Sequence, residues 1–191
     1  MPSVQPLSPA APARPRPRPL QAALALAGVT FVLATCWGAY RVWNGEPYPE
    51  VDPNVVGTRL RAEAERVQDD IGLPVPAEVL PQRVETGACS YRGLRSLAHI
   101  DRGRSDVRSF ILDWQTTDVP KDTARTAQER VRARLSQQGW KPTGQDFSDM
   151  GFGYEHQSTG DRVDVGWYEP TGTLAVSIHA PCGKVPEGYD E

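Results

Sequence analysis

A predominantly apolar run at residues 20–40, LQAALALAGVTFVLATCWGAY, constrains the structure of this chain more than any other feature. The run contains no Asp, Glu, Lys, Arg or His. At a rise of about 1.5 Å per residue, a helix of this length extends about 30 Å, which is the thickness of the hydrocarbon core of a bilayer. The run therefore predicts a single transmembrane helix, and the membrane is the first predicted partner.

Charged residues on either side of the run predict its orientation. Arg14, Arg16 and Arg18 precede it, whereas the first acidic residue of the chain is Glu46. By the positive-inside rule residues 1–19 stay in the cytoplasm, and their Pro-, Ala- and Arg-rich composition predicts a disordered tail. Aromatic side chains suited to the headgroup layer gather at the far end of the run: Trp37, Tyr40 and Trp43. We expect a signal-anchored, single-pass protein of the cell membrane.

Two other interpretations of the run stay open. A cleaved signal peptide requires a shorter apolar core and a small-x-small site, and a lipoprotein requires an acylated cysteine, here Cys36, preceded by small residues. Thr35 and Trp37 fit poorly beside an acylated cysteine, so the anchor is preferred. In every case the rest of the chain is exported, with residues 41–51 as a spacer and residues 52–191 as an extracytoplasmic domain.

The exported part of the chain is acidic. The whole chain carries 21 Lys and Arg against 24 Asp and Glu, a net charge of −3. Without the four arginines up to Arg41, 17 basic and 24 acidic residues remain, which is a net charge of −7. An acidic domain repels phosphates, so we predict no nucleic-acid partner and no polybasic lipid-binding role.

Two cysteines, Cys89 and Cys182, lie beyond the run, and export places them in an oxidising compartment. Two thiols without a nearby pair of histidines cannot complete a structural zinc site. Their spacing also differs from the Cys-x-x-Cys of redox catalysts. We therefore predict a structural disulfide between them, which would join the first strand of the domain to the end of the last.

Two segments have the periodicity of amphipathic helices. In the first, Asp52 and Pro53 favour a helix start and Gly72 favours an end, and the apolar stripe is Val56, Leu60, Ala64, Val67 and Ile71. The second extends from about Pro120 to Gln138, with an apolar face of Ala124, Ala127, Val131 and Leu135. Gly139 and Trp140 then predict a Schellman motif that closes onto Leu135.

Alternation of apolar and polar residues predicts strands around residues 109–114, 152–156, 163–167 and 174–178, and a further strand at residues 83–91. Turn residues at 158–160 and 170–172 predict that the last three strands form an antiparallel meander. The resulting order is α-β-β-α-β-β-β. We predict an α+β fold in which an N-terminal transmembrane helix precedes a mainly antiparallel sheet with two helices on one face.

The Pro-Arg tail, the lone apolar run and the exported domain with two cysteines are general features that many short exported proteins share. In these features the chain resembles uncharacterised single-pass, membrane-anchored proteins of actinobacteria. The resemblance implies an anchor followed by a small exported α+β domain. It assigns no functional residue.

Catalytic and metal-binding patterns are weak in this sequence. His99, His156 and His179 lack zinc-ligand spacing and have no evident nucleophile as a partner. Asp161 and Asp164 are interpreted as solvated turn carboxylates, because no Asp-x-Asp-x-Asp-Gly calcium loop is present. We expect no metal, no cofactor and no enzymatic activity.

The sheet face opposite the helices exposes Ile111, Tyr168, Ala175 and His179 and is a candidate binding face. A lightly apolar, solvated sheet face, which antiparallel sheets commonly have, is the interpretation that the pattern by itself favours. The leading hypothesis is a membrane-tethered binding or scaffold module for a membrane or envelope protein. Two alternatives are a domain that binds a small ligand or lipid between helices and sheet, and an envelope hydrolase.

Overall fold

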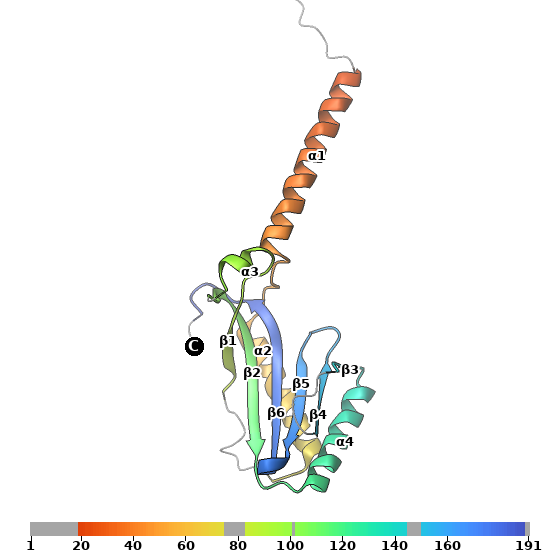
Figure 1. The fold of residues 1–191 in the computed structure, drawn as a ribbon, viewed down its shortest axis with the longest axis vertical. Helices are drawn as coiled ribbons and strands as arrows, with labels where there is room; N and C mark the ends of the chain where they lie inside the picture. Colours follow the sequence, from red (N-terminus) through yellow and green to blue (C-terminus); the bar gives the residue numbers. More distant parts are fainter. Residues whose placement is uncertain (1–18, 75–82, 101, 145–149, 190–191) are drawn as a thin grey trace, which may run out of the picture.

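The computed structural model describes residues 19–74, 83–100, 102–144 and 150–189, with side chains from Thr30 onward. Helix α1 (Pro19–Asn44) projects from a domain that contains α2 (Pro53–Ile71), the short α3 (Arg95–Ala98) and α4 (Lys121–Gln137), as Figure 1 shows. The strands are β1 (Glu85–Cys89), β2 (Arg104–Thr116), β3 (Lys141–Pro142), β4 (Met150–Glu155), β5 (Arg162–Tyr168) and β6 (Thr173–Lys184). A 3-10 turn, η1 (Glu169–Thr171), connects β5 to β6.

Helix α1 includes the residues of the predicted span, 20–40, and continues to Asn44. The first four residues of the predicted spacer, 41–44, are therefore helical. The predicted cytoplasmic tail before Pro19 and the side chains of residues 19–29 lie outside the described part of the chain. Among the helices as far as they are described, none combines the length and the apolar content needed to cross a membrane. The thiol of Cys36, on α1, is free and exposed.

The six strands form one antiparallel sheet in the order β1-β2-β6-β5-β4-β3. The predicted meander of β4, β5 and β6 is confirmed, with Val163 opposite Ile178 and Val165 opposite Val176. The predicted α+β class with an antiparallel sheet is likewise confirmed. The short elements α3 and β3 were not predicted, because they contain too few residues to show a periodic pattern.

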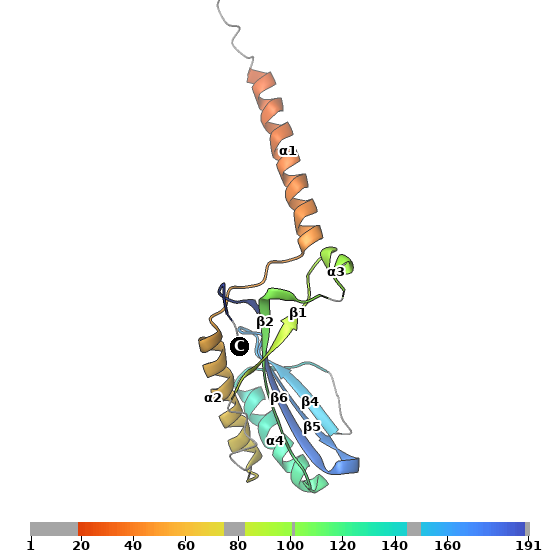
Figure 2. The same cartoon turned by 90° about the vertical axis from the view of Figure 1, so that its left-hand side faces the viewer.

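Helices α2 and α4 lie side by side on the same face of the sheet, as the side view in Figure 2 shows. Helix α2 contacts β2 and β6, and α4 contacts β4 and β5. Arg134 of α4 joins the two helices through ion pairs with Asp70 and, at 2.8 Å, with Glu63. The opposite face of the sheet carries neither helix.

The ends of both helices follow the predicted capping residues. The Asp52 carboxylate accepts a hydrogen bond from the Asn54 backbone N–H at 2.9 Å, and Gly72 adopts the left-handed conformation with φ 65°. At the end of α4, Gly139 has φ 82° and the Trp140 N–H donates to the Leu135 carbonyl at 3.0 Å. This bond is the long hydrogen bond of a Schellman motif, so the predicted motif is confirmed.

The predicted apolar faces of helices and strands meet in a single core between the two layers. Side chains from both layers are almost fully excluded from water: Leu60, Val67, Val131 and Leu135 from the helices, and Phe110, Leu112, Val163 and Ile178 from the strands. Because this layer is filled with packed side chains, the domain is held together mainly by burial of apolar surface.

Candidate functional site

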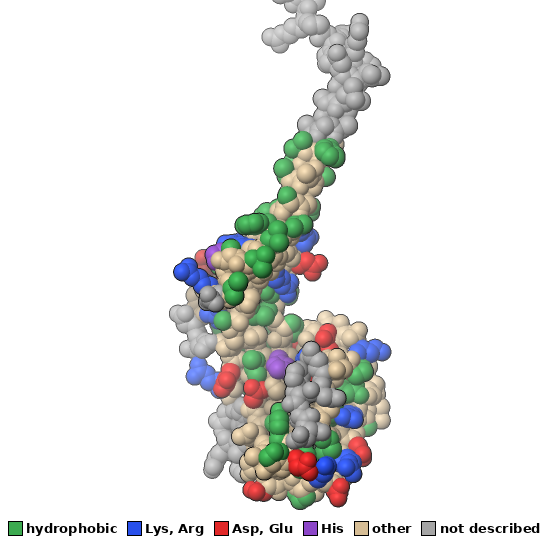
Figure 3. Space-filling view, in the orientation of Figure 1, with side chains coloured by type: hydrophobic (Ala, Val, Ile, Leu, Met, Phe, Trp, Pro, Cys, Tyr) green, Lys and Arg blue, Asp and Glu red, His purple; other side chains and the backbone are tan. Residues whose placement is uncertain are grey.

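Three neighbouring strands, β2, β6 and β5, build the sheet face that α2 and α4 leave open. Successive residues of a strand point to opposite faces. Leu112, Val176 and Val165 point into the core and are buried, whereas their chain neighbours Asp113, Ser177 and Asp164 form a cross-strand row on the open face. A hollow of about 660 Å³ lies over these strands. Figure 3 looks onto this face, where hydrophobic and charged side chains are interspersed.

The structure brings three of the four predicted face residues into this hollow. Tyr168, Ala175 and His179 line it, and the Tyr168 side chain is the most open of the three, with 39% of the residue exposed. Ile111 lies on the same face, directly opposite His179 in the β2–β6 ladder, but it is not among the residues that line the hollow. The hollow is therefore centred over β5 and β6, and Ile111 of β2 lies beside it on the same sheet face.

Polar contacts organise the part of the hollow nearest His179. The Asp164 carboxylate accepts a hydrogen bond from the Arg162 Nε at 2.9 Å, and its other oxygen lies 2.8 Å from the His179 Nε2. In the neighbouring strand pair, the Ser177 hydroxyl donates to the Asp113 carboxylate. These contacts hold ionisable groups of β5, β6 and β2 in fixed positions on an otherwise open surface.

Gly153 on β4 makes room for this cluster. It lies opposite Asp164 in the β4–β5 ladder. A Cβ at this position would collide with an Asp164 carboxylate oxygen and would lie 2.5 Å from the Thr143 hydroxyl. The strand glycine is thus required by the close approach of neighbouring side chains.

Asp164 is held in its ionised form. Burial by itself would raise the pKa of this carboxyl, but the hydrogen bonds and positive charges of His179 and Arg162 outweigh that effect and hold the pKa below its ordinary value. A carboxyl whose pKa is lower in the folded than in the unfolded state stabilises the fold above its unfolded pKa, and this contribution is lost as the pH falls through the folded pKa.

We therefore expect Asp164→Asn to destabilise the domain near neutral pH, by about 1–3 kcal/mol, because charged hydrogen bonds are lost. The difference in the free energy of unfolding between the variant and the unsubstituted protein should shrink as the pH falls below about 4. The unfolded carboxyl becomes protonated there, while the folded carboxyl stays ionised until a lower pH. Urea unfolding across this pH range measures it. Asp122→Asn is the matched control, because this α4 carboxylate is 92% exposed. A difference that stays constant down to the lowest pH would contradict the assignment.

The interpretation of Asp161 as a solvated carboxylate is wrong. Asp161 is only 5% exposed, and its carboxylate forms a two-pronged ion pair with Arg59 of α2, at 2.5 and 2.8 Å. Asp164 is likewise paired rather than solvated. Sequence reasoning missed both clusters because Arg59 and His179 are far from these aspartates in the chain.

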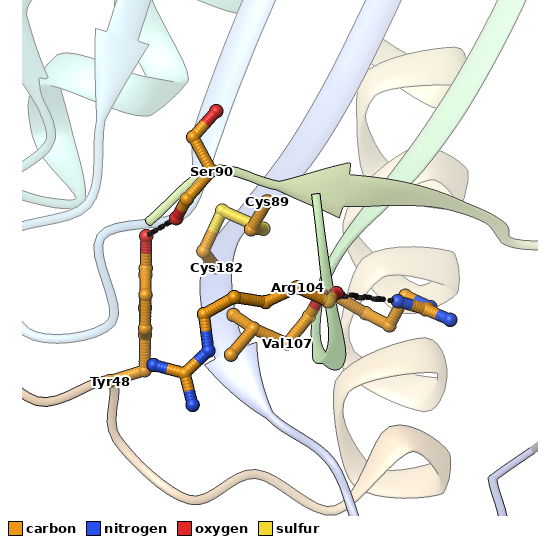
Figure 4. The surroundings of a disulfide bond; sticks show 7 residues. Tyr48, Cys89, Ser90, Arg104, Val107 and Cys182 are labelled. Carbon is orange, nitrogen blue, oxygen red and sulfur yellow. Dashed lines mark hydrogen bonds between the residues drawn. A yellow bond between two sulfur atoms is a disulfide. The ribbon is translucent and has the colours of Figure 1, made fainter. Parts of the chain in front are cut away.

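The predicted disulfide between Cys89 and Cys182 is confirmed, with 2.05 Å between the sulfur atoms (Figure 4). It connects β1 to β6, which both pair with β2 and not with each other. The β1–β2 ladder shifts register at this point, since Ala88 pairs with Arg108 but Cys89 pairs with Arg104. The Arg108 guanidinium donates to the Arg104 carbonyl at 3.0 Å across the irregular segment of β2.

Within the described residues, no group of three or more His, Cys, Asp or Glu side chains is placed to hold a metal ion. His99 and His156 lie apart from the hollow: the His99 ring packs on Tyr91, and the His156 ring packs on Trp140. Comparison of the chain with protein-family models, with curated proteins and with solved structures gives no match.

Proposed function

We propose that this protein is a membrane-tethered, extracytoplasmic binding module without enzymatic activity. Helix α1 anchors it in the cell membrane with the N-terminus in the cytoplasm. The open sheet face, with Ile111, Tyr168, Ala175 and His179, binds a protein of the membrane or envelope. The observation that carries the proposal is the hollow of about 660 Å³ on that face, because both packed helices lie on the other side of the sheet.

The composition of the hollow favours a protein partner. It combines an exposed aromatic ring, Tyr168, and a small apolar residue, Ala175, with the ordered polar pair of Asp164 and His179. Aromatic side chains that can bury a ring and still make a hydrogen bond are typical of protein interfaces. Polar groups that are already held in place lose little entropy when a partner binds.

The short connection between α1 and α2 supports a role near the membrane. Only residues 45–52 separate the two helices. A tether of this length confines the domain next to the bilayer and raises its effective concentration towards membrane partners. The charge pattern supports the orientation, because Arg14, Arg16 and Arg18 precede α1 and the acidic residues follow it.

The alternative site for a small ligand or lipid, between helices and sheet, has weaker support. That space is occupied by packed side chains such as Leu60, Leu135 and Ile178, each no more than 1% exposed. A partner can reach the other sheet face without displacing either packed helix.

A photo-crosslinking amino acid in place of Tyr168 tests the function. In membranes of the native host, we expect a discrete adduct with one protein, and none when the crosslinker replaces Glu129 on the exposed side of α4. Ala175→Arg places a charged side chain in the hollow and should abolish the adduct without lowering the melting temperature. Gln137→Arg, also exposed on α4, is the matched control and should leave the adduct intact. Identical patterns from positions 168 and 129 would refute the proposed face.

A further inference from the structure

A loop of the domain lies beside the end of α1. This membrane-proximal loop comprises the described residues 91–100 and 102–103, contains α3 and leads into β2. Figures 1 and 2 both place α3 next to the last turn of α1. The Leu94 N–H donates to the Val42 carbonyl at 3.1 Å. Gly93 allows this approach, because a Cβ there would lie 2.6 Å from the Val42 carbonyl oxygen and 2.7 Å from that of Trp43. The loop is therefore fixed at the level of Val42.

The loop exposes large apolar side chains at intervals of three residues. Leu94, Leu97 and Ile100 are 47%, 69% and 76% exposed. The end of α1 beside them also exposes aromatic rings, those of Trp37, Tyr40 and Trp43. Figure 3 shows hydrophobic side chains gathered where α1 meets the domain. A concentration of exposed apolar side chains of this kind marks a surface that is covered in the functional state.

The same loop is basic within an acidic domain. Its sequence holds Arg92, Arg95 and Arg102 and a single acidic residue, Asp101. Arg104, the first residue of β2, is neutralised by a two-pronged ion pair with Asp106, at 2.9 and 2.6 Å. The expectation that the exported part has no polybasic lipid-binding role rested on the net charge, which does not report this local excess. A cavity of about 930 Å³ between the loop and α1 is lined by Arg92 and Arg95, by Trp37 and Tyr40, and by Glu46 and the ion pair of Arg104 with Asp106.

Aromatic rings hold two of these arginines in place. The Arg92 guanidinium lies 3.8 Å from the centre of the Tyr48 ring, and the Arg95 guanidinium lies 4.8 Å from the centre of the Tyr91 ring. Tyr48 is itself fixed, because its hydroxyl donates to the Ser90 carbonyl at 2.7 Å, as Figure 4 shows. Stacked guanidinium groups keep donors on their edges for a phosphate.

We propose that the membrane-proximal loop docks onto the leaflet from which α1 emerges. Leu94, Leu97 and Ile100 enter the interfacial layer, and Arg92, Arg95 and Arg102 bind the phosphates of anionic phospholipids. This inference rests on the proposed anchoring by α1. It agrees with the depth of the loop: Val42 follows the last residue of the apolar run, Tyr40, by two residues, or about 3 Å along the helix. The headgroup layer is about 5–7 Å thick on each side of the hydrocarbon core.

The surface chemistry favours lipid over a protein at this site. Segments that lie in the interfacial plane combine apolar side chains with flanking Lys or Arg and with aromatic rings, and they bind anionic lipid by both contributions. The loop has all three features at the position where the chain would leave the bilayer. Docking would also fix the orientation of the domain relative to the bilayer. The loop is hydrogen-bonded to α1 through Leu94 and Val42, and it is continuous in the chain with β1 and β2.

A depth-sensitive fluorophore tests the docking in the full chain. A Cys36→Ser background leaves Leu97→Cys as the labelling site. Glu129→Cys, at an exposed position of α4, is the control, because Figure 1 shows α4 at the end of the domain away from α1. The proteins are reconstituted in phosphatidylcholine vesicles with and without phosphatidylglycerol and with a lipid-borne quencher at the level of the upper acyl chain. We expect quenching at position 97 only, and more of it with phosphatidylglycerol.

Charge variants separate lipid docking from other outcomes. Arg95→Gln with Arg102→Gln should lower the ratio of docked to undocked loop by about fivefold for each arginine in anionic vesicles. Arg125→Gln with Arg130→Gln, both exposed on α4, should have no effect.

Equal quenching at positions 97 and 129 in protein that resists carbonate extraction would overturn the docking but leave the anchor intact. Release by carbonate would overturn the anchor and the docking together. A third outcome would overturn the lipid assignment and indicate a protein partner. In that outcome the fluorophore at position 97 is not quenched in vesicles, but the cysteine at position 97 is protected from labelling in native membranes.

Discussion

Replacing Cys89 and Cys182 with alanine is expected to destabilise the domain by about 4–5 kcal/mol, the largest effect of any change considered. The disulfide closes a loop of 93 residues, and in the chain-entropy model the stabilisation grows with the length of the closed loop. For a domain of this size the melting temperature should fall by about 10–20 °C. Urea and thermal unfolding with and without reductant measure both quantities.

The free cysteine supplies the control for this experiment. Cys36→Ser removes an exposed thiol on α1 and should leave the unfolding midpoint of the domain unchanged. Peptide mapping without reductant checks that the bridge is present in the starting protein. Recovery of Cys89 and Cys182 as free thiols from protein made in an oxidising compartment, or equal midpoints with and without the bridge, would contradict the structural role.

Trp140→Gly is expected to destabilise the domain by about 3–5 kcal/mol, because a large buried aromatic side chain is lost. Trp140 is 7% exposed and belongs to the core, and its ring packs on that of His156 with 5.0 Å between the centres. Its backbone N–H also closes the Schellman motif at the end of α4. Urea unfolding at constant pH gives the loss directly.

Two further variants identify the source of that loss. Trp140→Ala keeps the ordinary backbone preferences and should retain most of the effect, whereas Trp140→Phe refills part of the volume and should cost less. Trp43→Ala changes an exposed ring on α1 and should leave the domain midpoint unaffected. A melting temperature unchanged by Trp140→Gly would mean that the ring does not contribute to the core.

The two proposed surfaces lie on different parts of the domain. The membrane-proximal loop lies beside α1, whereas the hollow with Tyr168 and Ala175 lies along β5 and β6 on the open sheet face. If the loop is docked, the tether no longer allows the domain to tumble freely. The open face is then presented at a fixed angle to the bilayer, which lowers the entropy lost when a membrane partner binds.

The sequence by itself determined the three long helices, most of the strands and the disulfide. The stripe of α2 and its ends at Asp52 and Gly72 are local patterns, because capping and periodicity depend on residues within one or two turns. Strand alternation placed Tyr168, Ala175 and His179 on one face for the same reason. The bridge followed from counting cysteines, since Cys89 and Cys182 were the only exported pair.

Only the tertiary structure decided which distant charges and loops meet. Asp161 pairs with Arg59 across 102 residues, and Asp164 meets His179 through the register of β5 against β6. The membrane-proximal loop reaches α1 because Gly93 has no side chain to keep the two backbones apart. Local propensity carries no information on such contacts, because they depend on strand order and on close approach between segments that lie far apart in the chain.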